Sequence, residues 1–383
     1  MEWLSIRSSR LMAENPPEPS RPAVLSRAQA SLPGRRAIVV GAGSFGTAIA
    51  VLLARAGVRA TLQTRTSPQA TLLAESRENA KYLPGIELPQ ALRIESVTSG
   101  VSRADFVFLA VPSTALGAVI DELSTRGLGR ANAMVSLCKG LVPPDGATAT
   151  TVLRARFGAH RTACIGGPAH AQEMVSYGAA LVAASLDDRL AEGLAAIFTR
   201  AGVVCEISSD PIGVELAAVA KNAAALAAGA TEAQGLNAAG AAAGHIFAEV
   251  WRYAAAGGAQ PESMIGLAGA GDLVATALAP QSRNRRAGEL LAQGVGAAEI
   301  ELQVGQAVEA LESVRLLAKA VQSSGFPAPV TVGLSRLISG ELPLEQWIAL
   351  VRTTVPMRSG RRGWWRRLFR VLLRRVSDAP PTL

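Results

Sequence analysis

The segment RRAIVVGAGSFGTAIAVLLARAG, residues 35–57, constrains the fold more than any other part of the chain. A short apolar run, Ala37–Val40, leads into three glycines with the G-x-G-x-x-G spacing: Gly41, Gly43 and Gly46. An apolar helix is expected to about Ala56, followed by a second strand at Arg59–Arg65. Glycines at such a turn let the backbone touch a pyrophosphate, and the free N–H groups of the helix N-terminus favour an anion. The order of elements predicts a dinucleotide-binding βαβ unit; the alternative is a tight turn without a ligand.

The end of the second strand bears on the choice of cofactor. An acidic side chain there would bind the ribose 2′-hydroxyl of NADH, but the residues are Gln63, Thr64, Arg65 and Thr66. The Arg65 guanidinium would suit the 2′-phosphate of NADPH instead. We therefore expect NADPH or NADH as the cofactor, with NADPH favoured. The alternative is that Arg65 is a solvated surface residue.

Further strand-like runs alternate with helical segments in the first half of the chain. They lie at 104–113, 133–141, 162–171, 179–185 and 203–210. This alternation predicts a doubly wound, Rossmann-like α/β domain. Ligands of such sheets bind beyond the carboxyl ends of the strands, where Lys139 and Gly167 are expected.

A change of pattern after Asp210 predicts a second domain. Asp210–Pro211 has the form of a helix N-cap followed by a proline in the first turn, and helical segments continue to about Thr354. The expected division is an extension at 1–34, a dinucleotide-binding domain at 35–208, an all-α substrate domain at 209–355 and a basic tail at 356–383. The extension is rich in Pro, Ser, Arg and Ala, is expected to be disordered and lacks the apolar core of a signal peptide.

The composition argues against several functions. Hydrophobic residues make up 49% of the chain and charged residues 18%, which is typical of a folded protein with a large core. The net charge of +8 equals the eight arginines between Arg358 and Arg375, and without them 30 basic residues balance 30 acidic ones. A neutral body argues against nucleic-acid binding. Three widely spaced cysteines favour a reducing, cytoplasmic setting, and no metal-ligand cluster is visible, so no metal site is expected.

The stretch ELAAVAKNAAALAAG, Glu215–Gly229, predicts a helix that packs on several sides, yet Lys221 and Asn222 lie in its middle. Lysine is rare in this chain, with 34 arginines beside only four lysines: Lys81, Lys139, Lys221 and Lys319. An amine can release a proton in the accessible pH range, whereas a guanidinium cannot. Desolvation among small apolar residues would lower the pKa of the amine toward a useful range. These features favour Lys221 as an acid–base group; the alternative is a lysine whose amine reaches the surface.

Eight segments occur in an order that resembles one protein family. They are AIVVGAGSFGTAIA, NAKYLPGIELP, FLAVPS, SLCKGL, GGPAHAQE, IGVELAAVAKNAAALAAG, GLAGAGDLVAT and SRNRRAGELLAQG. Together, between Arg36 and Thr354, they resemble the motifs of NAD(P)-dependent glycerol-3-phosphate dehydrogenase. The lysine–asparagine helix, the GLAGAGDL turn and the SRNRR run are specific in combination, whereas no single segment would be.

The resemblance implies a role for each motif. Lys221 would donate and accept the proton at the substrate carbon–oxygen bond, Lys139 would be a second cation beside it, and Asp272 would accept from Lys221 or a substrate hydroxyl. The implied substrate contacts are Lys139, Gly167, Ala169, Lys221, Asn222, Asp272, Ser282, Arg283 and Asn284. The implied cofactor contacts are Gly41, Gly43, Ser44, Phe45, Gly46, Arg65, Lys139, Ala171, Arg283, Ala307 and Glu309.

The SRN run bears on the substrate. A serine cap, a guanidinium and an amide at a helix N-terminus suit a phosphate dianion. The implied reaction is therefore reduction of dihydroxyacetone phosphate to sn-glycerol 3-phosphate, which would feed phospholipid synthesis. Two alternatives stay open: Asp272 would be only a helix N-cap, and the SRN run a solvated basic helix start. Arg285 and Arg286 would reinforce the positive field or face solvent.

Three positions depart from the usual residues of the family. Phe45 stands where tryptophan is frequent, Ala169–His170 where serine and phenylalanine are usual, and Ala310 where glycine is usual. These changes affect the expected cofactor contacts more than the reaction. His170 and His245 are tempting as acid–base groups, but His245 lies in an alanine-rich helix and is interpreted as a packed or surface histidine.

The basic tail lies outside the resemblance. The segment GWWRRLFRVLLRRV, Gly363–Val376, predicts an amphipathic helix with tryptophan, leucine and phenylalanine on one face and arginine on the other. Such a helix favours peripheral contact with anionic membrane; the alternatives are an oligomer contact or a disordered tail. A homodimer is a further hypothesis.

Two other functions compete with the family's reaction. A related two-domain reductase or a 3-hydroxyacid dehydrogenase would have a similar architecture, but an acid substrate needs no phosphate cradle. A non-catalytic NADPH-binding, membrane-associated protein would need none of the three charged residues Lys139, Lys221 and Asp272.

Overall fold

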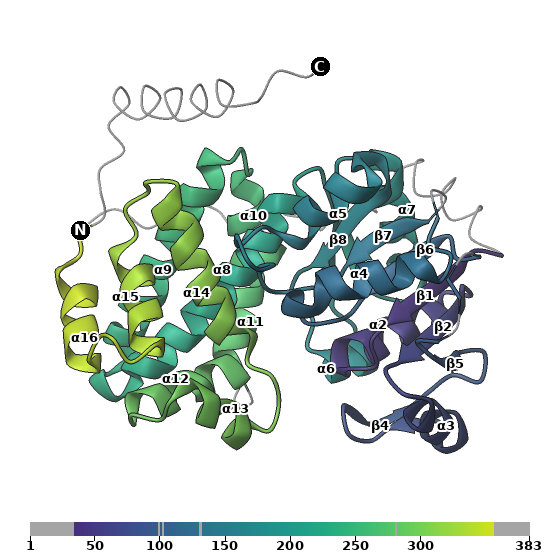
Figure 1. Cartoon of the computed structure of the whole chain (residues 1–383), viewed down its shortest axis with the longest axis horizontal. Coiled ribbons are helices and arrows are strands. Elements are labelled where there is room, and N and C mark those ends of the chain that lie inside the picture. Colours follow the sequence, from purple (N-terminus) through teal and green to yellow (C-terminus); the bar gives the residue numbers. More distant parts are fainter. Residues whose placement is uncertain (1–33, 99, 102, 130–131, 280–281, 356–383) are drawn as a thin grey trace, which may run out of the picture.

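The computed structural model describes residues 34–355 except 99, 102, 130–131 and 280–281. The expected extension before residue 34 and the expected tail at 356–383 therefore lie outside the described residues. The described chain forms an α/β part and a helical part that lie side by side (Figure 1). The last strand of the α/β part ends at Ser208, and the first helix of the helical part begins at Pro211.

The α/β part is built on one eight-stranded sheet. Its spatial order is β10 (Val204–Ser208), β9 (Ala180–Ser185), β8 (Thr162–Gly166), β7 (Ala133–Ser136), β6 (Phe106–Leu109), β1 (Arg36–Val40), β2 (Arg59–Thr64) and β5 (Arg93–Ser96). All neighbours are parallel except β8 and β9, which run antiparallel. The predicted doubly wound Rossmann-like domain is confirmed, with one antiparallel pair. Strand β5 and the hairpin formed by β3 (Glu78–Asn79) and β4 (Leu83–Glu87) were not predicted.

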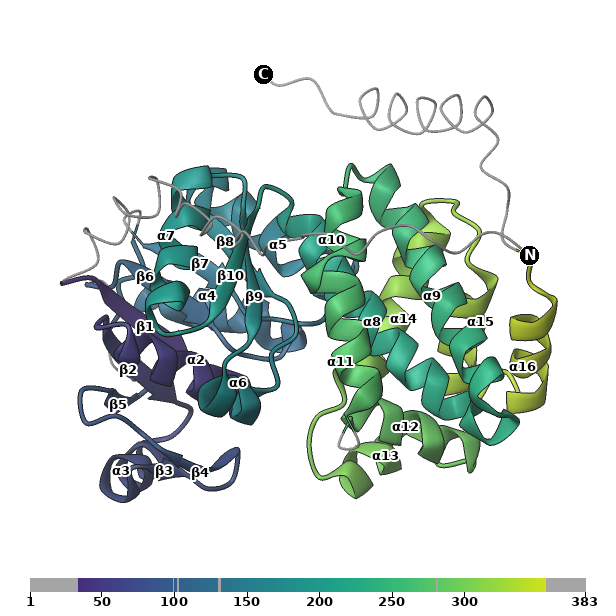
Figure 2. The same ribbon diagram turned by 180° about the vertical axis from the view of Figure 1, so that it is seen from behind.

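Helices cover both faces of the sheet (Figures 1 and 2). One face packs on α2 (Ser44–Arg55) and α7 (Asp188–Arg200), and the other on α4 (Leu116–Thr125) and α5 (Ala149–Phe157). The side-chain period of two sends successive strand residues to opposite faces. Val39 and Phe108 accordingly lie in the first core, whereas Val40 and Val107 lie in the second. The shorter helices α3 (Ser67–Ser76) and α6 (Ala171–Tyr177) lie beside this frame.

The strand order places the glycine turn at a topological switch point. From β1 the chain winds through α2 to β2 on one side, while β6 pairs with β1 on the other. Gly41 has a φ of 111°, and a Cβ there would lie 2.3 Å from the carbonyl oxygen of Ala110. Gly43 differs, because a Cβ there would have no neighbour within 4 Å. Packing therefore requires glycine at 41, whereas at 43 the described fold leaves open space beside the backbone.

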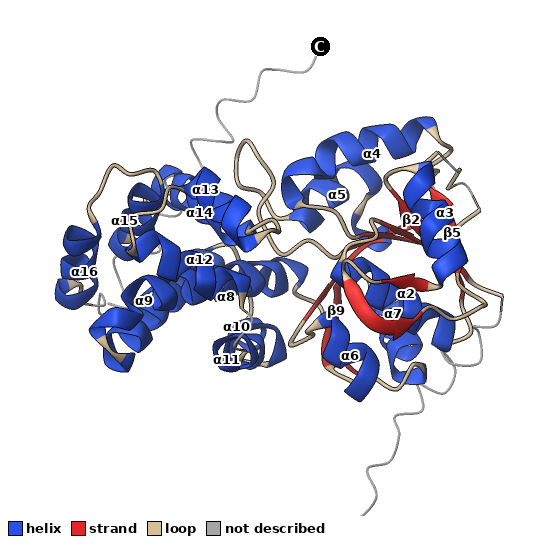
Figure 3. Cartoon of the chain, turned by 90° about the horizontal axis from the view of Figure 1, so that it is seen from below, coloured by secondary structure: helices blue, strands red, loops and turns tan. Residues whose placement is uncertain are grey.

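The described residues of the second part form helices and no strand, as predicted (Figure 3). In order they are α8 (Pro211–Thr231), α9 (Leu236–Ala256), α10 (Pro261–Ile265), the π-helical turn η4 (Leu267–Gly271), α11 (Asp272–Leu278), α12 (Arg283–Ala292), α13 (Ala297–Val304), α14 (Glu309–Ser323), α15 (Pro329–Ile338) and α16 (Leu344–Thr353). Helix α8 is central, with core contacts to α9, α12 and α14 and to strand β8 of the sheet.

The burial of α8 explains its composition. Within the described residues, the segment Pro211–Gln234 is the one helix long and apolar enough to cross a membrane by length and composition, but 89% of its apolar window is buried inside the protein. Its start was predicted: the Asp210 carboxylate accepts from the Gly213 N–H at 2.8 Å and from the Ser263 hydroxyl at 2.7 Å. Small residues let α12 approach closely, since a Cβ on Gly229 would lie 2.1 Å from the Arg285 carbonyl oxygen.

Candidate active site

The carboxyl ends of the parallel strands face the central helix of the helical part. Lys139 lies three residues beyond the end of β7, in the turn that meets α8. The side chain of Asn222, in the middle of α8, donates from Nδ2 to the Lys139 carbonyl oxygen at 3.2 Å. This hydrogen bond joins the two parts of the protein directly beside Lys221.

Three charged side chains meet at this junction. The Lys221 Nζ lies 3.2 Å from Asp272 Oδ2, and the Lys139 Nζ lies 4.0 Å from the same oxygen. Lys221 is 6% exposed and Asp272 is 3% exposed, so their ion pair is shielded from water. The Lys139 ammonium also lies 4.7 Å from the centroid of the Phe45 ring, a cation–π contact with the glycine turn. Residues from the first turn of α2, the turn after β7, α8 and α11 thus converge on one point.

The environment of Lys221 changes its proton affinity. Burial and then the nearby Lys139 charge lower the pKa of Lys221 from 10.5 to about 8, while Asp272 acts in the opposite direction. The two lysines repel each other, and the single carboxylate between them offsets part of that repulsion. An amine with this pKa both donates and accepts protons near neutral pH, as general acid–base chemistry requires.

Asp272 does not act as the helix cap that the sequence left open. It is the first residue of α11, and no side chain caps the N-terminus of that helix. Its carboxylate instead points to the two lysines. One turn later, Thr276 has a buried hydroxyl for which the described residues offer no hydrogen-bond partner. Thr276 was not among the predicted residues; its i, i+4 spacing from Asp272 was the available signal, because it places both side chains on one helix face.

The predicted helix start at the SRN run is present. The Ser282 hydroxyl caps α12 by accepting from the Arg285 N–H at 3.4 Å. Asn284 donates from Nδ2 to the Asn222 side-chain oxygen at 2.9 Å, which ties α12 to α8 beside Lys221. Arg283 is directed elsewhere: its guanidinium donates to the Ala307 carbonyl oxygen at 3.2 Å. Both asparagines thus lie next to Lys221 or Lys139, whereas Arg283 bonds to Gln306 and Ala307.

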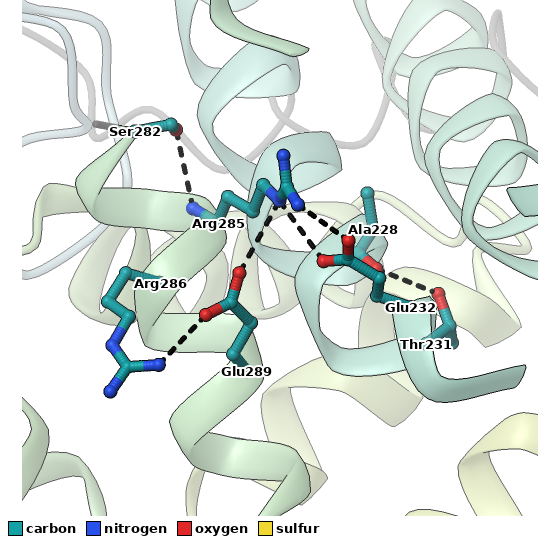
Figure 4. Close-up of polar contacts among 7 residues, drawn as sticks. All are labelled: Ala228, Thr231, Glu232, Ser282, Arg285, Arg286 and Glu289. Carbon is teal, nitrogen blue, oxygen red and sulfur yellow. Dashed lines mark hydrogen bonds and ion pairs between the residues drawn. The ribbon is translucent and has the colours of Figure 1, made fainter. Parts of the chain in front are cut away.

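Arg285 and Arg286 both pair with carboxylates (Figure 4). Arg285 donates to both carboxylate oxygens of Glu232, at 3.1 and 2.5 Å, and lies 3.4 Å from Glu289. Arg286 donates to Glu289 at 2.9 Å. Arg286 is exposed, as the solvent-facing alternative expected, whereas Arg285 is held by Glu232, which lies 53 residues away in sequence.

The remaining predicted positions lie along the strand ends. Ser44 and Gly46 belong to the first turn of α2, where a Cβ on Gly46 would lie 2.1 Å from the Gly41 carbonyl oxygen. Arg65 is exposed just beyond β2. Three strand spacings of about 4.8 Å separate β2 from β7, so Arg65 is about 14 Å or more from Lys139. Arg65 therefore belongs to the opposite end of an elongated site.

The turn after β8 completes this edge. Gly167 has a φ of 102°, and a Cβ there would lie 2.6 Å from the Ala180 carbonyl oxygen, so β9 leaves room only for glycine. Ala169 is buried, and Ala171 begins α6. His170 Nε2 is buried, and no residue in the described ranges pairs with it. His245 is half-buried on α9, as interpreted from its helix.

The α14 end of the site carries the last predicted cofactor contact. Glu309 is the first residue of α14 and is half-buried. Its charge reaches the cluster, where it helps to raise the pKa of Lys221. Across the described ranges, no group of three or more His, Cys, Asp or Glu side chains is arranged to hold a metal ion.

The sheet, the glycine turn and the buried lysine over the strand ends define a class, the two-domain dinucleotide-dependent dehydrogenases. Comparison with known families narrows this class. The NAD-dependent glycerol-3-phosphate dehydrogenase N-terminus matches residues 36–191, and the C-terminus of the same family matches residues 210–349. The chain therefore belongs to the NAD-dependent glycerol-3-phosphate dehydrogenase family.

Individual relatives agree with this assignment. A glycerol-3-phosphate dehydrogenase [NAD(P)+] of Deinococcus radiodurans is 39% identical over 307 residues, which are 79% of this chain and 90% of the relative. One of Methylibium petroleiphilum is 33% identical over 319 residues, 81% of this chain and 94% of the relative. The crystal structure of a glycerol-3-phosphate dehydrogenase from Coxiella burnetii superposes with a TM-score of 0.77 at 28% identity, covering 84% of this chain and 99% of that one.

The charge cluster predicts how Lys221 titrates in variants. Asp272→Asn removes the attraction that favours the ammonium, so the pKa of Lys221 should fall below about 8. Lys139→Met removes the repulsion, so that pKa should rise. Because the chain has only four lysines, the ¹³Cε shifts of labelled lysine can be followed individually by NMR. A Lys221 signal that titrates identically in both variants and the wild type would contradict this account, and Lys319 serves as the internal control.

Proposed function

We propose that this protein catalyses the reversible NAD(P)H-dependent reduction of dihydroxyacetone phosphate to sn-glycerol 3-phosphate, and thereby supplies glycerophospholipid synthesis. One observation carries the proposal: a buried amine with a pKa of about 8 lies 3.2 Å from a buried carboxylate at the strand ends of a dinucleotide-binding sheet. Membership of the glycerol-3-phosphate dehydrogenase family supports the choice of substrate.

The cofactor fits the residues that are present. The open space at Gly43 and the free N–H groups of the first turn of α2 suit a pyrophosphate. Asn79 holds this turn in shape, since its Nδ2 donates to the Ala42 carbonyl oxygen at 3.0 Å and to the Thr47 hydroxyl at 2.8 Å. We assign Ser44, Phe45 and the α14 end of the site to the same cofactor. When bound, NAD(P)H supplies a hydride for a carbonyl carbon.

The charged residues then act on the substrate oxygen. Lys221 gives its proton to the oxygen of the ketone as negative charge develops there, so that one hydride and one proton convert the carbonyl into a secondary alcohol. Lys139 stabilises the developing charge, and Asp272 holds the Lys221 amine in place and favours its protonated form. In the reverse direction the neutral amine of Lys221 takes the hydroxyl proton.

The helical part holds the other end of the substrate. We assign the phosphate to the N-terminal turn of α12, where Asn284 lies beside Asn222 and the Arg283 guanidinium is exposed at the rim. The unpartnered hydroxyl of Thr276 is a further candidate to bind a substrate oxygen. A phosphate held at this helix start would fix the ketone beside the Lys221 amine. A 3-hydroxyacid has no phosphate and would not require such a binding site.

Removal of the amine should abolish the reaction. Lys221→Met should lower kcat for dihydroxyacetone phosphate reduction by at least ~10²-fold, the usual contribution of a positioned acid, while NADPH still binds. The wild-type rate of reduction should fall as pH rises through about 8, because the amine then loses its proton. NADPH oxidation is followed at 340 nm, and NADPH affinity by fluorescence titration.

Lys319→Met is the matched control, because Lys319 is exposed and its amine contacts the Pro144 carbonyl oxygen at 2.7 Å and Asp145 at 3.9 Å rather than the charged cluster. It should keep the wild-type rate. A Lys221→Met enzyme of normal activity would refute the acid–base role. A wild type that is inactive on dihydroxyacetone phosphate but reduces a 2- or 3-oxo acid would favour the related reductases.

The preference for NADPH is proposed from Arg65. Because this guanidinium is exposed beyond β2 and no acid follows the strand, Arg65→Ala should raise the KM for NADPH roughly tenfold, about 1.4 kcal/mol, and leave the KM for NADH unchanged. Arg59→Ala, at the opposite end of the same strand, is the control and should change neither constant. Equal effects of Arg65→Ala on both cofactors would argue against a 2′-phosphate contact.

A peripheral membrane contact is proposed from the sequence of Gly363–Val376 alone. Deletion of residues 356–383 should abolish sedimentation of the protein with vesicles of phosphatidylglycerol and leave the rate of reduction in solution unchanged. Vesicles of phosphatidylcholine are the uncharged control, and equal binding by the full and shortened chains would exclude this role. Sedimentation equilibrium on the same two proteins tests the hypothesis of a homodimer and of a tail that joins the subunits.

A further inference from the structure

Two buried glutamates make nearly identical contacts in different places. Glu215 of α8 is 5% exposed and accepts from the Thr150 N–H at 2.9 Å and from the Thr150 hydroxyl. Glu249 of α9 is 2% exposed and accepts from the Thr331 N–H at 2.8 Å and from the Thr331 hydroxyl at 2.7 Å. In each case a carboxylate binds the first turn of another helix, α5 or α15, where free N–H groups and the helix dipole favour a negative charge.

The two contacts differ in what they connect. Glu249 and Thr331 both belong to the helical part, so that bond stays within one part. Glu215 belongs to the helical part, but Thr150 belongs to the α/β part, 65 residues earlier. The hydrogen bond between Glu215 and Thr150 therefore connects the helical part to the α/β part. The hydrogen bond from Asn222 to the Lys139 carbonyl oxygen does the same. Both bonds start from α8, seven residues or about 10 Å apart along its axis.

Lys221 lies near one end of the segment of α8 between Glu215 and Asn222, the two residues that bond to the α/β part. Its partners are divided between the two parts: Asp272 moves with the helical part, whereas Lys139 belongs to the α/β part. The distance between the two amines therefore depends on how α8 is held against the sheet. Burial raises the pKa of Glu215 above its usual value, and hydrogen bonds from Thr150, Ser136 and Thr148 oppose that rise. All three of these residues belong to the α/β part.

We infer that Glu215 is a positioning residue, whose carboxylate fastens α8 to α5 and so fixes the Lys221 amine relative to Lys139 and the cofactor side of the site. A buried carboxylate is a costly way to gain stability alone, since an apolar contact would pack as well. The hydrogen bonds of the Glu215 carboxylate depend on direction, so they favour one relative position of the helical part and the α/β part. The kinetic consequence rests on the proposed function, whereas the structural one does not.

Because Lys221 has one charged partner in each part of the protein, the inference predicts the direction in which its pKa changes when α8 loosens. If α8 loosens from the α/β part, Lys221 loses burial and the repulsion from Lys139, the two largest causes of its lowered pKa, while Asp272 stays with it. The pKa of Lys221 must then rise as kcat falls. A purely structural role for Glu215 would lower the melting temperature without moving that pKa.

The test compares two matched pairs of full-length variants. Glu215→Gln should lower kcat for dihydroxyacetone phosphate about 10- to 100-fold through misplacement of the amine. It should also shift the basic limb of the pH–rate profile and the ¹³Cε titration of Lys221 to higher pH, with the NADPH affinity unchanged. Thr150→Val, which removes only the hydroxyl donor, should act in the same direction to a smaller extent. Glu249→Gln and Thr331→Val should lower the melting temperature but leave kcat, the limb and the Lys221 titration as in the wild type.

The inference is overturned if Glu215→Gln leaves the Lys221 titration unchanged, or if Glu249→Gln moves it equally. If Glu215→Gln does not fold, the comparison of Thr150→Val with Thr331→Val decides. The inference is then overturned if Thr150→Val leaves the Lys221 titration unchanged, or if Thr331→Val moves it equally. The NMR titration requires no activity. A wild type that is inactive on dihydroxyacetone phosphate would therefore refute the proposed function, while the titration would still confirm or overturn the role of Glu215.

Discussion

The burial of α8 on every side is the constraint on which the site depends. A helix of alanine, valine and leucine packs against the sheet, α9, α12 and α14 at once, so a polar side chain in its middle has no access to bulk water. The Lys221 amine must then find a charged partner or lose its proton, and in this structure it does part of each. It pairs with Asp272 at 3.2 Å, and its pKa falls to about 8. The lowered pKa that suits Lys221 to its proposed acid–base role thus follows from packing rather than from any special chemistry of the lysine.

The same packing joins the two parts of the protein. Close approach of α12 at Gly229 brings Asn284 to Asn222, and Asn222 reaches the Lys139 carbonyl oxygen. A chain of amide hydrogen bonds therefore runs from the proposed phosphate end of the site to the strand ends of the sheet. In the proposed function this network couples the position of the substrate to that of the cofactor, because Asn222 bonds to both neighbours at once.

Much of the fold was predictable from local patterns, because glycine spacing, apolar alternation and helix caps act over a few residues. The βαβ unit, the change to helices after Asp210 and the helix start at Ser282 are examples. The hairpin of β3 and β4 was missed because Pro84 and Gly85 interrupt any alternation within it. The antiparallel direction of β9 was also missed, since a strand's pattern of side chains is the same in either direction.

The sequence by itself determined which residue types were available: a glycine turn, one lysine at a strand end, one lysine in a buried helix, and a carboxylate directly after a glycine-rich turn. Only the tertiary structure decided which of them meet, because burial patterns specify a face but not the partner across it. Arg285 was neutralised by Glu232, the Thr276 hydroxyl was left without a partner among the described residues, and Glu215 was bound to Thr150. Each of these outcomes depends on the packing of segments that lie far apart in the chain, which no local pattern encodes.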